Sequence, residues 1–129
     1  MIKDRVFRNY IKGTLIKFLK RHEGEKVVMS DLMPTLFTRL SKSQLKVFER
    51  RRKYIFENFD DYGSSYCINK SLYQYSKVAF YLTILSVEST YILYRNDFIF
   101  DNWDNEIILT KEIIENIKSS WQTIHDGII

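Results

Sequence analysis

Cysteine, proline and glycine are all scarce in this sequence, which has one cysteine, one proline and four glycines among its 129 residues. The single Cys67 cannot form an internal disulfide, so a reducing, cytoplasmic setting is expected. A turn-rich β-sandwich needs many glycines and prolines, and their scarcity argues against that class. The composition predicts a single domain over residues 1–129, built mostly from long helices around a core rich in aromatic rings.

Long hydrophobic runs are also missing. The longest apolar stretch without a charged residue runs from Val78 to Val87 and includes Thr83 and Ser86, whereas a membrane span needs about 20 apolar residues. The first residues lack the apolar segment and the small-residue cleavage site of a signal peptide. The chain is therefore expected to be soluble, with no membrane partner.

Motifs that carry catalysis are absent as well. His22 and His125 lie far apart in the sequence without a metal-ligand pattern, and a nucleophilic pair would require Cys67 to meet one of them in space. The glycines stand alone and form no phosphate-binding loop. Four acids have a calcium-loop rhythm without its glycine and final glutamate, which favours a solvated loop: Asp97, Asp101, Asp104 and Glu106. The sequence predicts a non-enzymatic protein with no metal, no cofactor and no small-molecule substrate.

Positive charge is concentrated in the first half of the chain. Residues 1–53 hold 15 of the 20 lysines and arginines but only five acids, a net charge of +10, whereas residues 54–129 carry a net charge of −6. We accordingly divide the chain into a basic part, 1–59, and an acidic part, 60–129. Such a separation is typical of a polarised molecule whose basic side attracts phosphates. It predicts an anion-binding surface if folding keeps these cations together.

The chain begins with an amphipathic helix. Residues 2–21 have apolar side chains at helical spacing, and Gly24 is placed to end the helix. A set of cations falls together on one flank of this helix: Arg5, Arg8 and Lys12. These residues are the first part of the predicted basic surface.

Three further elements are expected in the basic part. They are a strand over 26–29, a helix over 31–40 that tolerates Pro34, and a helix from Ser41 or Ser43 to about residue 59. The last helix opposes an apolar stripe with a second set of cations: Lys42, Lys46, Arg50 and Lys53. Arg52 falls on the apolar stripe, so it must extend to solvent, pair with an acid or contact a partner.

The acidic part is more ambiguous. Residues 71–94 are rich in aromatic and β-branched side chains without glycine or proline, so a long buried helix and a β-meander both fit. We favour a helix over 71–87 and a hairpin over 91–100. Residues 107–109 are expected to form a strand, followed by a helix from 110 to about 125. Gly127 is placed to end that helix.

The expected fold class is predominantly α, with α+β as an open alternative. It comprises an N-terminal three-helix unit, a long apolar helix or meander, a small hairpin and a C-terminal helix. The order of elements over residues 14–57 resembles a winged helix-turn-helix. This resemblance rests on Leu15–Lys20, Val27–Leu32 and Ser41–Leu45, and a wing is expected near 60–69.

In the winged helix-turn-helix family the second helix of the pair enters the major groove of DNA. The resemblance implies that one set of residues faces bases or phosphates: Lys42, Ser43, Gln44 and Lys46. It implies a second set on the DNA backbone: Arg50, Arg51 and Lys53. The alternative is a solvated helix face, because the four consecutive residues 50–53 point around the whole circumference of a helix.

Length and the frequent use of Ile, Lys, Asn and Tyr also resemble the small host-takeover proteins of T-even bacteriophages, which include an RNA polymerase-binding member. This second resemblance implies host RNA polymerase as a partner. The function expected from the sequence is transcription regulation by binding duplex DNA, host RNA polymerase or both through a basic helical face. The alternative is an inhibitor or adaptor of a host complex that makes no nucleic-acid contact.

Overall fold

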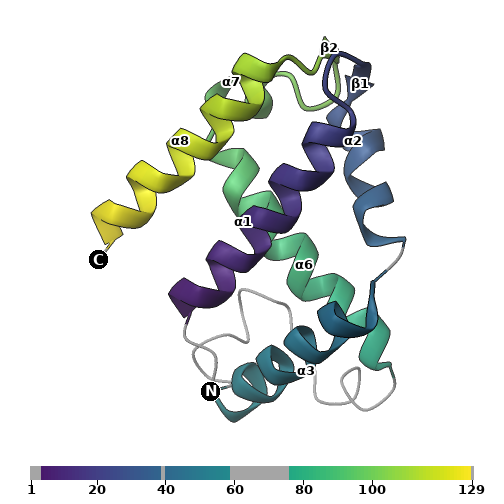
Figure 1. Cartoon of the computed structure of the whole chain (residues 1–129), viewed down its shortest axis with the longest axis vertical. Coiled ribbons are helices and arrows are strands. Elements are labelled where there is room, and N and C mark those ends of the chain that lie inside the picture. Colours follow the sequence, from purple (N-terminus) through teal and green to yellow (C-terminus); the bar gives the residue numbers. More distant parts are fainter. Residues whose placement is uncertain (1–3, 39, 59–75, 129) are drawn as a thin grey trace.

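The computed structural model describes residues 4–38, 40–58 and 76–128, with side chains over 5–38, 40–58 and 76–119. These ranges are mostly helical, as Figure 1 shows, which confirms the predominantly α prediction. The elements, in order, are α1 (Asp4–Arg21), β1 (Lys26–Val28), α2 (Met29–Leu32), the 3-10 helix η1 (Met33–Phe37), α3 (Lys42–Glu57), α6 (Lys77–Tyr94), α7 (Asp97–Asp101), β2 (Glu106–Ile108) and α8 (Lys111–Ile128).

Helix α1 confirms the first predicted helix. Its apolar side chains recur at helical spacing, and Phe7, Ile11 and Leu15 are fully buried along one face. Gly24 follows with φ 84°, a left-handed conformation that glycine adopts without the steric cost of a Cβ. The Gly24 N–H donates to the carbonyl of Leu109 over 2.7 Å, which ties the end of α1 to a remote part of the chain.

Strands β1 and β2 form a two-stranded antiparallel sheet in which Val27 lies opposite Ile107. The strands predicted over 26–29 and 107–109 are therefore confirmed, each within one residue at its ends. The wing expected near 60–69 lies outside the described residues. Within the ranges that are described, the partner of β1 is β2, a segment from the acidic part of the chain.

The helix predicted over 31–40 is wrong beyond Leu32, where the α-helix gives way to the 3-10 helix η1. Pro34 lacks the N–H that would donate to the Ser30 carbonyl in a continuous α-helix, and its ring would clash with that carbonyl. The chain therefore tightens into a 3-10 turn. The Thr35 hydroxyl adds a hydrogen bond of 2.6 Å to the carbonyl of Leu32.

Helix α3 begins at a capping box. The Ser41 hydroxyl accepts from the Gln44 N–H over 3.2 Å, and the Gln44 side-chain oxygen accepts from the Ser41 N–H over 2.8 Å. These bonds satisfy two backbone donors near the helix start. Of the two predicted caps, Ser41 is therefore the one used. The inner face of α3 buries Phe48 and Ile55 completely.

Helix α6 lies at the centre of the molecule, where it contacts α1, α3, α7, α8 and η1 (Figure 1). Its side chains are apolar around most of its circumference, which suits a helix enclosed by others. The helix favoured over 71–87 is thus confirmed for residues 77–87 and continues to Tyr94, and residues 71–75 lie outside the description. The hairpin predicted over 91–100 is wrong, because α6 continues to Tyr94 and α7 follows.

The start of α7 explains this difference. Asn96 is buried, and its side-chain oxygen accepts from the N–H of Ile99 over 3.0 Å, which caps a new helical turn. Ile92 and Leu93 continue the buried spacing of α6, and Ile99 is also fully buried. Tertiary packing therefore overrides the strand propensity of this aromatic segment.

Helix α8 completes the described fold. The Thr110 hydroxyl accepts from the N–H of Ile113 over 3.2 Å, and Ile114 and Ile117 are buried. The helix extends through Gly127 to Ile128, beyond its predicted end. Among the described helices, none combines the length and apolarity needed to cross a lipid bilayer.

Candidate nucleic-acid interface

Four cations form a continuous band on the outer face of α3, which we call the α3 stripe: Lys42, Lys46, Arg50 and Lys53. All four residues are exposed. At 100° per residue they fall within about 80° of the helix circumference, opposite the buried Phe48 and Ile55. With a rise of about 1.5 Å per residue, the stripe is roughly 16 Å long.

The charge of the α3 stripe is not neutralised within the part of the chain that is described. No ion pair is formed there by any of its four residues. Glu57 is exposed on the same face at the C-terminal end of α3. The positive potential is therefore strongest toward the N-terminal half of the helix, where the helix dipole has the same sign.

Ser43 and Gln44, predicted to face bases or phosphates, lie at the start of α3. Ser43 is exposed, and its hydroxyl lies 3.1 Å from that of Ser41. Gln44 is half-buried, and its side-chain oxygen is engaged in the capping box. Ser43 therefore remains available to a partner, whereas the Gln44 oxygen supports the helix.

The structure removes Arg51 from the predicted surface. Its side chain is fully buried, with its guanidinium 4.8 Å from the ring centre of Phe7 and 5.1 Å from that of Tyr54. Cation–π contacts of this kind stabilise a desolvated guanidinium. The interpretation of Arg51 as a DNA-backbone contact is therefore wrong for this conformation, because α3 turns this position toward α1.

Arg52 follows one of the alternatives left open by the sequence, because it pairs with an acid. It is largely buried and donates to the carboxylate of Glu49, which also accepts a hydrogen bond from the Tyr81 hydroxyl of α6. This Arg52–Glu49–Tyr81 network joins α3 to α6. The run of consecutive basic residues therefore divides into exposed Arg50 and Lys53 and inward-facing Arg51 and Arg52.

The network shifts the pKa of Glu49. Burial raises this pKa. The hydrogen bonds from Tyr81 and Arg52 and the charges of Arg52 and Lys77 lower it by more than burial raises it. The net pKa lies below the ordinary value of 4.5. A lowered carboxyl pKa stabilises the folded state above the unfolded-state pKa, and this contribution is lost as the pH falls through the folded-state value.

We therefore expect Glu49→Gln to flatten the acid side of the stability profile. Urea unfolding at a series of pH values should show the wild type losing more free energy of unfolding below about pH 4.5 than the variant does. Glu57→Gln, which changes an exposed acid of the same helix, should keep the wild-type slope. Equal slopes for wild type and Glu49→Gln would contradict the assignment.

The cations predicted on the flank of α1 differ in exposure, and one of them is paired with an acid. Arg8 is directed toward α6, where its guanidinium nitrogen lies 3.4 Å from the carboxylate of buried Glu88 and its guanidinium lies 5.5 Å from the ring centre of Tyr91. Lys12 is half-buried, and Arg5 remains exposed. An acid from the second half of the chain thus neutralises part of the predicted α1 surface.

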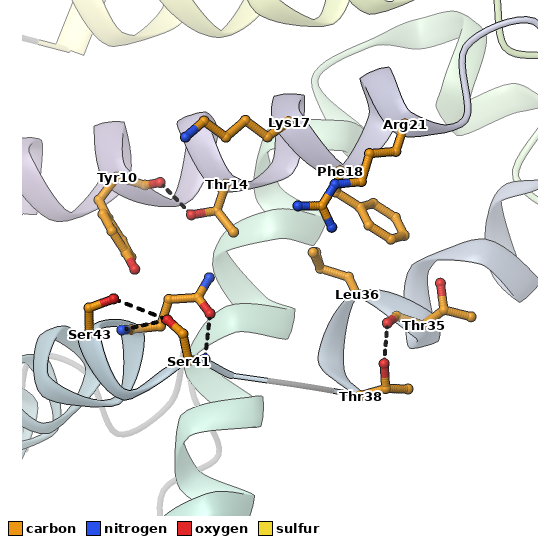
Figure 2. Close-up of a pocket in the computed structure, with 11 residues that line it drawn as sticks. Tyr10, Thr14, Lys17, Phe18, Arg21, Thr35, Leu36, Thr38, Ser41 and Ser43 are labelled. Atoms are coloured by element: carbon orange, nitrogen blue, oxygen red, sulfur yellow. Dashed lines mark hydrogen bonds between the residues drawn. The ribbon is translucent and has the colours of Figure 1, made fainter.

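A polar groove of about 560 Å³ lies between α1, η1 and the start of α3. Helix α1 lines it with one face at helical spacing: Tyr10, Thr14, Lys17 and Arg21. In Figure 2 the Arg21 guanidinium extends from α1 into the space above Leu36 of η1. The sequence interpretation missed Lys17 and Arg21 as site residues, although their spacing from Tyr10 and Thr14 places all four on one helix face.

Hydroxyl groups line the opposite side of the polar groove. They come from Thr35 of η1, from Thr38 directly after it, and from Ser41 and Ser43 at the start of α3 (Figure 2). The Thr35 and Thr38 hydroxyls already donate to the carbonyls of Leu32 and Thr35. The cations and the serine hydroxyls are therefore the side-chain donors that the groove offers to phosphate oxygens. Because Lys42 lies between Ser41 and Ser43, the polar groove adjoins the N-terminal end of the α3 stripe.

The residues considered for catalysis do not form a site in the described structure. His22 is half-buried, and its Nδ1 lies 2.7 Å from the carboxylate of Glu25. The side chains of Cys67 and His125 lie outside the description. No group of three metal-ligating side chains occurs among the residues described.

No family model, no curated protein and no solved structure matches this chain.

Proposed function

We propose that this chain is a small non-enzymatic binding protein that docks on duplex DNA through the α3 stripe. The observation that carries the proposal is the alignment of Lys42, Lys46, Arg50 and Lys53 on one exposed helix face, without an ion pair in the described part of the chain. Four cations on one side of a helix attract a polyanion, and each phosphate that they neutralise releases counterions.

The dimensions of the α3 stripe suit a DNA backbone. A stripe of roughly 16 Å spans about five base pairs, since phosphates recur about every 3.4 Å of axis along each strand. Lysine contacts a phosphate as a point charge, and three of the four stripe residues are lysines. These features favour backbone contact over base reading. We therefore expect weak dependence on DNA sequence.

The polar groove extends the same surface beyond the start of α3. Lys17 and Arg21 add two exposed cations on its α1 side, and the unbonded N–H groups of the first helical turn add a positive partial charge. A DNA backbone that follows the α3 stripe past Lys42 would meet these donors. This arrangement supports the α3 start as the stronger end of the interface.

We extend the proposal to DNA held by the host RNA polymerase, because length and composition resemble those of small phage host-takeover proteins. The protein would then regulate transcription either by competing with the polymerase for DNA or by binding the DNA together with the polymerase. The alternative function is an inhibitor or adaptor that binds a protein complex without contacting nucleic acid. In that case nuclease treatment should not reduce the recovery of the complex with this chain.

A pull-down from a bacterial lysate, divided into nuclease-treated and untreated halves, tests the proposal. Direct DNA binding predicts that nucleic acid and its associated proteins are recovered with the chain from the untreated half but not from the nuclease-treated half. It also predicts that the purified chain is retained on a duplex DNA column. Recovery of the same protein complex in both halves, with no column retention, would instead establish the adaptor function and reject DNA docking.

A further inference from the structure

The surface around α7 combines exposed aromatic rings with exposed acids. Phe98 and Phe100 are 45% and 56% exposed, although Ile99 between them is fully buried. Asp97 and Asp101 are also exposed. At helical spacing the two acids point outward between the two rings, so each side of α7 presents an aromatic flank beside a carboxylate.

A second aromatic group adjoins Phe100. The Tyr94 ring is 5.3 Å from that of Phe100 and 5.2 Å from that of Trp103, and both pairs are edge-to-face. Tyr94 is 43% exposed and Trp103 is half-buried. Three touching rings therefore form one apolar area at the surface. Grouped exposed rings of this kind are more typical of an interaction site than isolated surface hydrophobics are.

Acids outnumber cations around these rings. Asp104 and Glu106 are exposed in the segment that leads into β2, in addition to the two aspartates of α7. Two cations lie nearby in the sequence: exposed Lys111, and Arg95, whose guanidinium is 5.0 Å from the Tyr91 ring centre. We call Tyr94, Asp97, Phe98, Phe100, Asp101 and Trp103 the acidic aromatic surface.

The acidic aromatic surface and the α3 stripe lie toward opposite ends of the long axis of the molecule. Figure 1 shows α3 at the lower end, and α7 with the β1–β2 sheet toward the upper end. A single DNA segment on the α3 stripe would therefore not cover α7, and the acids would repel it there. The two surfaces have opposite charge and require different partners.

We propose that the acidic aromatic surface docks an arginine-bearing segment of a partner protein. Guanidinium groups stack on exposed aromatic faces and form bidentate bonds with carboxylates, and α7 offers both within one helical turn. A second copy of this chain would bring the α3 stripe, in which three of four cations are lysines with compact, strongly hydrated charges. The mixture of rings and acids favours arginine. The protein would then bridge DNA and a basic protein segment.

Calorimetric titration with a blocked peptide that alternates arginine and glycine tests this proposal, with the lysine–glycine peptide as the comparison. We expect the wild type to prefer the arginine peptide. Phe98→Leu with Phe100→Leu keeps both side chains apolar but removes two rings, and should weaken arginine-peptide binding about tenfold. Asp97→Asn with Asp101→Asn should also weaken it, whereas Glu57→Gln with Glu115→Gln, two exposed acids that do not line the hollow beside Phe98, should leave it unchanged.

Thermal unfolding establishes whether each variant is folded. If the double ring variant does not fold, Phe100→Leu alone replaces it, because Phe100 is the more exposed of the two rings. The single variant should then show a smaller but measurable loss of affinity for the arginine peptide. Equal affinity of wild type and ring variants would overturn the proposal. Self-association of the wild type that is lost on reversing the α3 stripe would overturn it in favour of a second copy as the occupant.

Discussion

Replacing Lys42, Lys46 and Arg50 together by glutamate should lower the affinity for duplex DNA about 100-fold or more at moderate salt. The change removes three cations from the α3 stripe and places three anions against the phosphates. All three side chains are exposed, so the fold should be retained. Fluorescence anisotropy with a labelled duplex of about two helical turns gives the affinity, and circular dichroism checks the fold.

A matched variant separates local from total charge. Lys20→Glu, Lys26→Glu and Lys111→Glu make the same change in net charge at exposed positions outside the α3 stripe. We expect this variant to lose only the few-fold affinity that accompanies a lower net charge. If both triple variants lose affinity equally, the α3 stripe is not the interface and binding reflects overall charge.

Phe48→Ala should produce the largest loss of stability of any single substitution proposed for this chain. The Phe48 ring is fully buried. Its centre lies 5.8 Å and 6.3 Å from the ring centres of Phe7 and Tyr10 in α1, and 6.2 Å from the ring centre of Tyr81 in α6. Removing it leaves a cavity where three helices meet. Such substitutions cost about 3–5 kcal/mol, a large share of the roughly 5–15 kcal/mol of a typical domain.

Urea unfolding followed by circular dichroism measures this effect. Val78→Ala removes apolar atoms at a site that is 58% exposed, and should change the free energy of unfolding by less than about 0.5 kcal/mol. A comparable loss in the two variants would mean that Phe48 does not hold α3 against α1 and α6. The orientation of the α3 stripe would then be unsupported.

Local signals predicted the elements with strong boundaries. Helix α1 could be placed because its apolar positions recur at helical spacing and Gly24 follows in the conformation that glycine favours. Helix α3 could be placed because Ser41 and Ser43 are candidate caps ahead of an amphipathic segment, and the structure shows that Ser41 is the cap, in a capping box with Gln44. In both cases the information lies within a few residues of the boundary.

Tertiary packing decided the elements that were predicted wrongly. The segment 91–100 is rich in residues that favour strands, but Ile92, Leu93 and Ile99 are all buried in the common core. A hairpin would have exposed part of that set. Pro34 shortened a helix by removing one backbone donor, and the preference for a 3-10 continuation was not visible in the apolar spacing.

The candidate site was predicted in part. Spacing on α3 identified Lys42, Lys46, Arg50 and Lys53 as one face, but could not show that Arg51 would pack against the ring of Phe7 in α1. Contacts between remote segments also reduced the predicted charge separation, as Arg8 with Glu88 demonstrates. The separation persists between α3 and α7, which lie far apart along the molecule (Figure 1).

The salt dependence of DNA affinity tests the central claim most directly. If the four cations of the α3 stripe neutralise about four phosphates, log Kd should rise with log salt with a slope of roughly 3.6, at about 0.9 per phosphate. Removing two of those charges by Lys46→Gln and Arg50→Gln should lower the slope by roughly 1.8. An unchanged slope in that variant, or no salt dependence in the wild type, would contradict DNA docking through α3.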